Sequence, residues 1–132
     1  MNTLSVKSRT KTELIDITAE VQNIVHKTGV KEGMCFVYVP HTTAAVTINE
    51  NADPSVRKDI VDEMNKIVPW DDNYAHMEGN SAAHIKATLF GATSAIPISK
   101  GRLSLGTWQG IYFCEFDGPR NREVLVQTVK SE

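Results

Sequence analysis

The chain has 132 residues, of which 41% are hydrophobic and 23% are charged, and its net charge is -2. These values are typical of globular proteins, so we expect one domain over residues 1–132 rather than a disordered or fibrous chain. The slightly negative net charge argues against nucleic acid as a partner. No apolar run approaches the ~20 residues that are needed to cross a membrane.

The first 30 residues predict two strands and a helix. Short apolar runs on both sides of the polar segment Ser8–Thr12 predict an N-terminal hairpin. Thr18 is expected to cap a helix with Val21 and Val25 on one side, and Gly29 is expected to end it in a left-handed conformation.

The central part of the chain predicts two strands and a second helix. Cys35–Val39 is apolar on both faces and ends at a proline, which favours a central strand, and Ala44–Asn49 alternates as a second strand. Asp53 before Pro54 is a strong helix start, because the carboxylate accepts from free N–H groups. The apolar face of this helix is formed by Val56, Ile60, Met64 and Ile67.

The remainder predicts a long loop, a third helix and three strands. The segment Val68–Asn80 has no regular pattern, and irregular segments of this length are more often functional than idle. Ser81–Phe90 is expected to be a helix that Gly91 stops. Its inward residues would be Ala82, Ile85 and Leu89, and further strands are expected at 94–98, 110–116 and 124–129. This order of elements predicts a two-layer α+β fold.

The N-terminus and the cysteines bear on the location. The N-terminal segment lacks the apolar stretch and cleavage site of a signal peptide, so a cytoplasmic location is expected. Cys35 and Cys114 each lie inside an apolar run, which predicts buried free thiols rather than a disulfide.

Three of the four histidines fall at the ends of predicted elements, where side chains can converge on one site. His41 follows a strand, His76 lies in the long loop, and His84 lies in the first turn of a helix. Their spacing matches no metal motif, so each is a catalyst, a metal ligand or a simple surface group. His26 is excluded, since an imidazole near a helix C-terminus favours the helix dipole.

Carboxylates and amides near His41 and in the last strands are further candidates. Asn49, Glu50 and Asp53 follow His41 within one strand and a turn, so they could lie near a proton carrier, although Asp53 could be a cap alone. Glu115 shares a strand face with apolar residues, so it is either the partner of a buried cation or a catalytic acid or base.

Two loops could hold a ligand. Gly79 and Asn80 precede a helix whose free N–H groups could bind an anion with help from Lys86, although many helices begin in this way. In the segment 104–110, glycines flank Trp108, which either contacts a ligand or fills the core under a bend.

Three segments resemble the YjbQ-like family, whose members are described as secondary thiamine-phosphate synthase enzymes. They are HTTAAVTINENADP from His41, HMEGNSAAHIKATLFG from His76 and GRLSLGTWQGIYFCEFDGPRNR from Gly101, and the resemblance covers almost the whole chain. It implies a β-sandwich with helices, assembled as a homotrimer. It also implies an activity that joins hydroxymethylpyrimidine diphosphate to a thiazole phosphate and releases diphosphate.

The motifs and the resemblance together give the expected site residues. The catalytic candidates are His41, Asn49, Glu50, Asp53, His76, His84 and Glu115. The substrate-binding candidates are Thr42, Gly79, Asn80, Thr107, Trp108, Gln109 and Arg120.

Three chemistries stay open for these residues. A transferase could neutralise the departing diphosphate with Mg²⁺ and with Lys100, Arg102 or Arg120. A zinc ion held by His41, His76 and His84 would instead favour hydrolysis of a small substrate. A trimeric binding protein without turnover is the third possibility.

Overall fold

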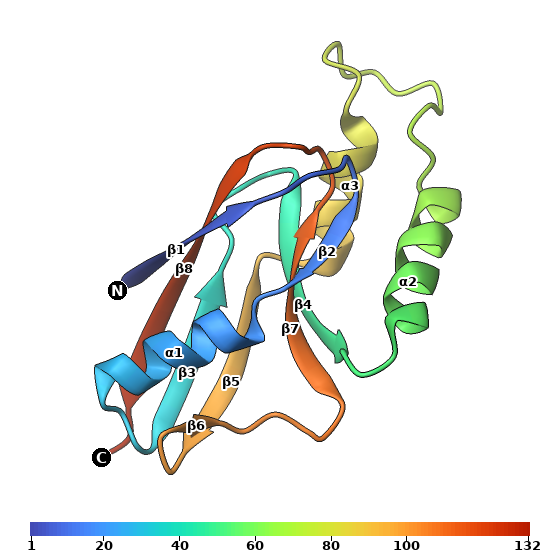
Figure 1. Cartoon of the computed structure of the whole chain (residues 1–132). Coiled ribbons are helices and arrows are strands. Elements are labelled where there is room, and N and C mark those ends of the chain that lie inside the picture. The colour runs from blue at the N-terminus through green and yellow to red at the C-terminus, as the bar shows by residue number, and fades with distance from the viewer.

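The structure, a computed structural model, describes all 132 residues and contains three helices and eight strands (Figure 1). The helices are α1 (Thr18–Thr28), α2 (Pro54–Ile67) and α3 (Ser81–Phe90). The strands are β1 (Asn2–Lys7), β2 (Glu13–Asp16), β3 (Gly33–Tyr38), β4 (Ala44–Glu50), β5 (Thr93–Ser99), β6 (Arg102–Leu103), β7 (Gln109–Glu115) and β8 (Asn121–Lys130). None of the helices has the length and apolar character needed to span a membrane.

The strands form two antiparallel sheets. One sheet has the order β1-β8-β3-β5-β6, and the other has the order β2-β7-β4. With three helices beside the two sheets, the fold is α+β as predicted, and β3 is the central strand expected from Cys35–Val39.

The main core lies between the two sheets. Val37 and Val124 of the five-stranded sheet share one buried cluster with Val46 and Phe113 of the three-stranded sheet. Helix α1 adds Val21 and Val25 to the same cluster. The β-branched and aromatic residues of the strands therefore supply most of this interior.

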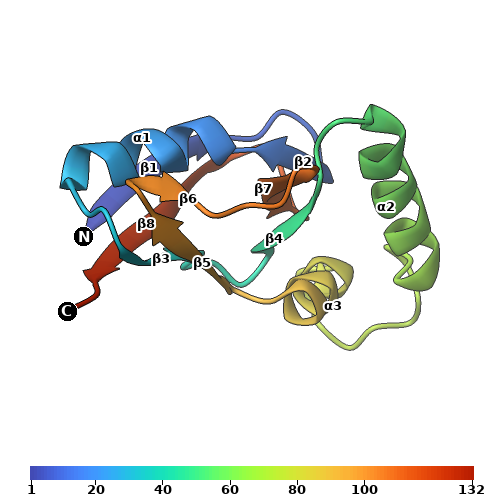
Figure 2. The same ribbon diagram turned by 90° about the horizontal axis from the view of Figure 1, so that it is seen from below.

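The three-stranded sheet is buried on both faces. Ile111 and Phe113 of β7 lie in the main core, whereas Tyr112 and Cys114 point the opposite way into a second cluster. Helices α2 and α3 lie beside this second face, away from α1 (Figure 2). Side chains alternate along a strand, so a strand covered on both faces becomes buried throughout, as β7 is from Gly110 to Glu115.

The expected N-terminal hairpin is wrong. Strands β1 and β2 belong to different sheets: β1 pairs with β8, and β2 pairs with β7. The segment Ser8–Thr12 therefore carries the chain from one sheet to the other. A short-range turn pattern misled the prediction, because the true partners lie more than 90 residues further along the chain.

The ends of the first two helices follow local rules, with one exception. Gly29 ends α1 with a φ of 74°, and Asp53 caps α2 by accepting from the N–H of Ser55 at 2.9 Å, both as expected. Thr18, however, does not cap α1. It is the first helical residue, and its N–H and hydroxyl both donate to Asp16.

The expected inward faces of α2 and α3 are partly wrong. Ala82 is buried as predicted, but Ile85 and Leu89 are 38% and 61% exposed. Ala83 and Lys86 are buried in their place. The small alanines allow α3 to pack on β4, and Lys86 reaches Asn65 of α2. In α2, no residue is fully buried, and Ile67 is 62% exposed.

The two cysteines are free and buried, as predicted. The outer face of β3 is not covered, although its sequence is apolar on both faces: Phe36 and Tyr38 are 37% and 47% exposed. On the neighbouring strand β8, Val129 pairs with Met34 and is 51% exposed. The five-stranded sheet therefore presents apolar and aromatic side chains outward.

Candidate functional site

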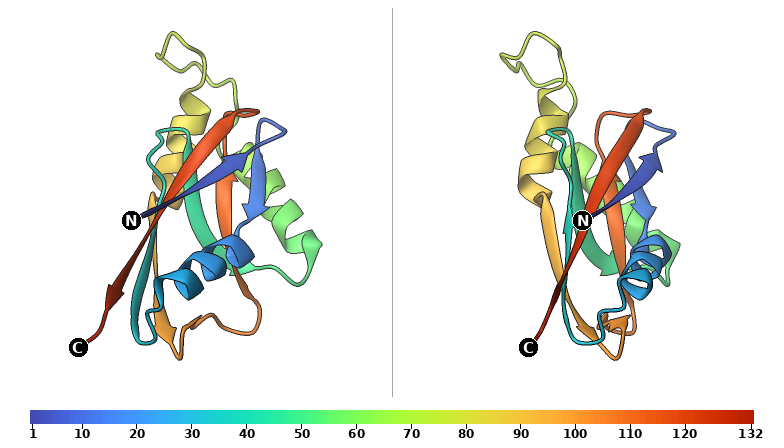
Figure 3. Two further views of the ribbon diagram at one scale, coloured as in Figure 1. Left: turned by 60° about the vertical axis from the view of Figure 1, so that its left-hand side comes forward. Right: turned by 90° about the vertical axis from the view of Figure 1, so that its left-hand side faces the viewer.

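A polar cavity of about 500 Å³ opens where β4 begins and β7 ends. Eleven residues line it, and none of them is hydrophobic. They come from the β3–β4 connection, the loop before α3, the start of α3, and the β7–β8 turn with the start of β8: Pro40, His41, Thr42, Thr43, His76, Glu78, Asn80, His84, Asp117, Arg120 and Arg122. Figures 1 and 3 show the loop before α3 rising past the ends of the strands at this end of the molecule.

The three candidate histidines meet in this cavity. The rings of His76 and His84 have centroids 5.5 Å apart and stand almost perpendicular, at 88°. His41 lines the same cavity and also shares an adjacent one with His84. The loop and helix after Val68 thus bring two histidines to a third that precedes β4.

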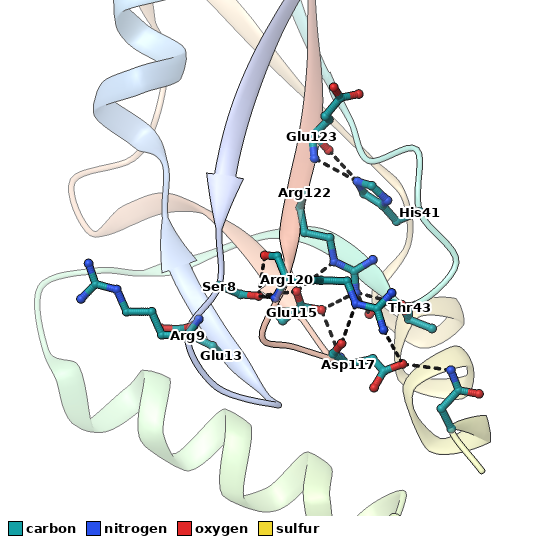
Figure 4. Close-up of polar contacts among 11 residues, drawn as sticks. Ser8, Arg9, Glu13, His41, Thr43, Glu115, Asp117, Arg120, Arg122 and Glu123 are labelled. Atoms are coloured by element: carbon teal, nitrogen blue, oxygen red, sulfur yellow. Dashed lines mark hydrogen bonds and ion pairs between the residues drawn. The ribbon is translucent and has the colours of Figure 1, made fainter. Parts of the chain in front are cut away.

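His41 is held in place by strand β8. Its Nε2 lies 3.0 Å from the backbone nitrogen of Glu123, which donates to it, and 3.1 Å from the carbonyl oxygen (Figure 4). Burial lowers the pKa of His41, and the positive charge of Arg122 lowers it further, against the opposing effect of the Glu123 backbone. Nε2 accepts from the N–H of Glu123 when it is unprotonated and donates to the carbonyl when it is protonated, so either form of the ring is held by β8.

The histidines do not form a complete metal site within one chain. No group of three or more histidine, cysteine, aspartate or glutamate side chains is arranged to hold a metal ion. Structural and catalytic zinc sites need at least three protein ligands, and His41 already directs one nitrogen to the β8 backbone. A divalent metal, Mg²⁺ or Zn²⁺, therefore stays a prediction from the residues and the expected chemistry.

A buried hydrogen-bonded network lies under the cavity. Glu115 is fully buried, and its Oε1 accepts from the Ser8 hydroxyl at 2.6 Å and from Arg122 Nε at 2.9 Å (Figure 4). Its Oε2 accepts from Arg122 Nη2 and from the backbone N–H of Asp117 at 3.0 Å. Arg122 Nη2 also donates to Thr43 Oγ1 at 2.8 Å, which ties β8 to the segment before β4.

This network decides between the two expected roles of Glu115. Burial alone would raise the pKa of Glu115, but hydrogen bonds from Arg122, Ser8 and the Asp117 backbone outweigh burial and hold the pKa below its usual range. A carboxylate that accepts four hydrogen bonds has no free position for a reacting proton. The geometry therefore supports the ion-pair role rather than acid–base catalysis.

Asn80, Asp117 and Arg120 form a second polar group at the cavity wall. Asp117 Oδ2 accepts from Asn80 Nδ2 at 2.9 Å and from Arg120 Nη2 at 3.1 Å, and its backbone carbonyl accepts from Arg120 Nε. Asn80 Oδ1 is buried and has no partner, although it belongs to a cavity-lining residue. Gly79, with a φ of 75°, turns the chain into α3 just before Asn80.

The other expected site residues lie at the opposite end of β4 and β7. Asn49 and Glu50 are the last residues of β4, and Asn49 pairs with Gly110 at the start of β7. A strand of seven residues spans about 20 Å, so they lie about that far from His41 and the cavity. The expectation that these acceptors lie near His41 is therefore wrong, because an extended strand separates its ends as far as it can.

The expected site residues that lie outside the cavity make mainly local contacts. The carboxylate of Asp53 caps α2, and its hydrogen bonds from Ser55 lower its pKa. Gln109 Oε1 accepts from the N–H of Gly106 and closes the turn that contains Thr107. Trp108 is 63% exposed, which excludes the role of a core-filling side chain. Its carbonyl accepts from the N–H of Asn51, just after the end of β4, so it lies at the end of the sheet away from the histidines.

The basic residues that were expected to help bind an anion lie in different parts of the structure. Lys86 is buried and donates to Asn65 of α2 at 2.5 Å, so it points away from the cavity. Lys100 and Arg102 lie in and next to the β5–β6 turn, and Arg102 lines a different cavity beside α1. Of the expected cations, only Arg120 lines the polar cavity.

Sequence reasoning missed Ser8, Thr43 and Arg122 as parts of the site. A signal for Arg122 existed: along β8 it shares a face with Val124 and Val126, which are both buried in the main core. An arginine on a buried face requires an anionic partner. Glu115, on a buried face of β7, was the available carboxylate.

Comparisons with known proteins agree with one another. The sequence pattern of the family described as UPF0047 protein YjbQ-like matches residues 2–131. The UPF0047 protein YugU of Bacillus subtilis is 49% identical over 128 residues, which cover 96% of this chain and 97% of YugU. A UPF0047 protein of Methanocaldococcus jannaschii is also 49% identical, over 94% of this chain and 90% of that protein.

Solved structures give the same result. A crystal structure of an uncharacterised YjbQ/UPF0047 protein from Clostridium acetobutylicum superposes with a TM-score of 0.96 at 51% identity, covering 98% of this chain and 100% of that one. A YbjQ-like protein of unknown function from Sulfolobus solfataricus gives 0.95 at 34% identity, covering 98% and 96%. Sequence and structure together show that the chain belongs to the YjbQ-like UPF0047 family.

Proposed function

We propose that this chain is an enzyme that acts on a small phosphorylated substrate in the cavity of His41, His76 and His84. The specific reaction is the one implied by the resemblance: a thiamine-phosphate synthase-like transfer that joins hydroxymethylpyrimidine diphosphate to thiazole phosphate. The observation that carries the proposal is the lining of the cavity, which holds three histidines and two arginines and no hydrophobic residue. Such a lining suits a charged, strongly hydrated ligand better than an apolar one.

The histidines supply the proton chemistry that this transfer needs. The bond between the pyrimidine methylene carbon and the diphosphate oxygen breaks, and the thiazole nitrogen forms the new bond to that carbon. The departing oxygen is stabilised when a protonated imidazole donates to it. His76 and His84 are suited to this role, since neither ring makes a hydrogen bond within the chain, and His76 Nε2 lies 3.9 Å from Glu78 Oε2.

Asn80 adds a feature that suits substrate binding. Its Oδ1 is buried without a donor, and an unpaired buried acceptor lowers stability unless a ligand or water completes it. The hydrogen bond from Nδ2 to Asp117 fixes which end of the amide carries the oxygen. A hydroxyl or amino group of a bound substrate would complete this acceptor.

The same proposal includes a homotrimer and a cytoplasmic location. Phe36, Tyr38 and Val129 leave an apolar patch on the outer face of the five-stranded sheet, and contiguous exposed apolar patches are typical of protein interfaces. The two free, buried cysteines are compatible with a reducing compartment.

The test of this function is the substitution His84→Ala. We expect turnover of the two thiamine precursors, measured as thiamine phosphate formed, to fall by at least ~100-fold, the lower range for loss of a general acid or base. The melting temperature should change little, because alanine is favourable in helix α3. His26→Ala is the matched control, since His26 is an exposed histidine in the last turn of α1.

Other outcomes separate the alternatives. Hydrolysis of the pyrimidine diphosphate without use of the thiazole phosphate would show a hydrolase. Absence of turnover of either kind, with and without added Mg²⁺ or Zn²⁺, would contradict the enzyme proposal and favour a binding protein.

A further inference from the structure

We infer that Arg122 anchors a phosphate group of the substrate through its terminal nitrogen Nη1, so that the buried Glu115–Arg122 pair is an anion-binding device. The inference rests on the proposed function for the substrate class alone and not for the reaction. It assigns to Arg122 the role that the sequence suggested for Arg120.

The hydrogen bonds of Arg122 leave one part of the guanidinium free. Nε donates to Glu115, and Nη2 donates to Glu115 and Thr43. A guanidinium carries five N–H donors, so the two on Nη1 make no hydrogen bond within the chain. Figure 4 shows this nitrogen without a contact, on the side of the network where His41 and Thr43 lie.

Nη1 reaches open space although Arg122 is only 4% exposed. Only two buried side-chain polar atoms lack a hydrogen-bond partner, Arg57 Nε and Asn80 Oδ1. Nη1 of Arg122 also lacks a partner but is not one of these two atoms, so it is not fully buried. Arg122 lines the polar cavity together with His41 and Thr42. A nearly buried guanidinium with its free edge in a polar cavity is a fixed pair of donors, and binding a ligand there requires no loss of side-chain freedom.

The positive charge of Arg122 is felt in the cavity despite its partner. Arg122 contributes more to lowering the pKa of His41 than Glu115 contributes to raising it. Glu115 thus orients the guanidinium without cancelling its field on the cavity side. The free edge of the guanidinium can donate hydrogen bonds but cannot accept them or coordinate a metal ion. Its ligand must therefore supply acceptor oxygens, and a phosphate group presents them in a geometry that matches the planar edge.

Arg120 is less suited to this role. Its Nε and Nη2 are directed to Asp117, and its side chain is 49% exposed, so solvent screens its charge. We therefore expect Arg120 to adjust the affinity for an anion and Arg122 to determine it.

The experiment measures binding of inorganic diphosphate rather than turnover. Calorimetric titration of the wild type should be compared with Arg122→Lys, Arg120→Lys and Arg102→Lys, at constant ionic strength and with acetate as a second probe. Lysine keeps the positive charge but lacks the planar guanidinium, so it cannot donate to Glu115, Thr43 and the ligand at the same time in this geometry. We expect Arg122→Lys to weaken diphosphate binding by about tenfold or more, the effect of losing one charge-assisted contact. Arg102→Lys, in the other cavity, should bind as the wild type does.

A second measurement does not depend on the folding of the variant. In arginine-labelled wild-type protein, the side-chain nitrogen signals of Arg122, assigned through the Arg122→Lys spectrum or by through-bond correlation to its backbone, should shift on addition of diphosphate. Wild-type affinity in Arg122→Lys, a larger loss in Arg120→Lys, stronger binding of acetate, or an unmoved Arg122 signal at saturation would each overturn the inference. Diphosphate binding through Arg122 without turnover of the precursors would keep the inference and reject the proposed reaction.

Discussion

The ion pair of Glu115 and Arg122 is the residue-scale feature on which both the cavity floor and the stability of the fold depend. Its two charges are withdrawn from water, and every oxygen of the carboxylate is hydrogen-bonded. Removal of one member would leave the other charge buried and unpaired, which is the most unfavourable of the possible states.

We predict that Glu115→Gln lowers the free energy of unfolding by about 3 to 5 kcal/mol at neutral pH, as for broken buried ion pairs. The pKa of Glu115 is lower in the folded chain than its usual 4.5, so its contribution is fully present above pH 4.5 and is lost as the pH falls toward the folded value. Urea unfolding at a series of pH values would show the wild type and the variant converging in acid.

Glu123→Gln is the control for this prediction, because Glu123 lies on β8 with an exposed side chain and contacts His41 through its backbone alone. If Glu115→Gln unfolds no more easily than Glu123→Gln, the ion pair contributes nothing to stability.

The sequence predicted one half of this pair. Strand alternation placed Glu115 on a buried face with Ile111 and Phe113, and the structure confirms that placement. Arg122 was missed because its partner lies across the sandwich on another strand, and the pairing depends on how the two sheets face each other. The alternation along β8 marks Arg122 as facing the core with Val124 and Val126, but it does not identify the partner.

At the scale of elements, α3 is the helix that joins the cavity to the rest of the fold. Its N-terminal turn carries Asn80 and His84 at the cavity, and its inner face carries the buried Lys86, whose ammonium contacts Asn65 of α2. No carboxylate forms an ion pair with Lys86, so burial alone accounts for the lowered pKa of its ammonium group.

We predict that Lys86→Met stabilises the protein by on the order of 1 kcal/mol, since methionine fills similar space without a charge to bury. In the wild type, the lysine pKa is lower in the folded than in the unfolded chain, so stability should rise as the pH increases from the folded value toward 10.5. The variant should lack this rise when thermal unfolding is followed between pH 7 and about 10.

Lys66→Met is a suitable control, because Lys66 is exposed at the end of α2. Destabilisation by Lys86→Met that exceeds the effect of Lys66→Met would mean that the hydrogen bond to Asn65 outweighs the unfavourable burial.

The elements were predicted well where local rules determine them and poorly where distant contacts do. The proline start of α2 and the glycine end of α1 are local, and both were confirmed. The partner of β1 and the inner face of α3 depend on residues far along the chain. For α3, the prediction placed Ile85 and Leu89 inward, whereas the buried residues are Ala82, Ala83 and Lys86.

At the scale of the whole molecule, the expected site residues separate into two groups at opposite ends of the sandwich. His41, His76 and His84 gather at one end, and Asn49 and Trp108 lie at the other. The sequence motifs gave a set of candidate residues, and the direction of β4 shows which of these candidates lie close enough to share a ligand.

We predict that the protein sediments with the mass of three 14.6-kDa chains. The exposed Phe36 and Tyr38 would then be buried between copies, because an uncovered aromatic sheet face is unfavourable in water. The double substitution Phe36→Lys and Tyr38→Glu should give smaller species in sedimentation velocity.

Leu89→Glu is the control for the trimer, since Leu89 is 61% exposed on a different face, on α3. A wild type that sediments as one chain at micromolar concentration would contradict the assembly.

The loop between α2 and α3 has a consequence for protease treatment. It stands clear of the body in two views (Figure 3), and Met77 in it is 99% exposed, so a protease should cut there first. The two fragments would be interleaved: in the order β1-β8-β3-β5-β6, the first and third strands come from one fragment and the others from its complement. The second sheet is shared in the same way, with β7 between β2 and β4. A nicked protein should therefore keep the mobility of the uncut protein in a native gel and separate into two bands only in detergent.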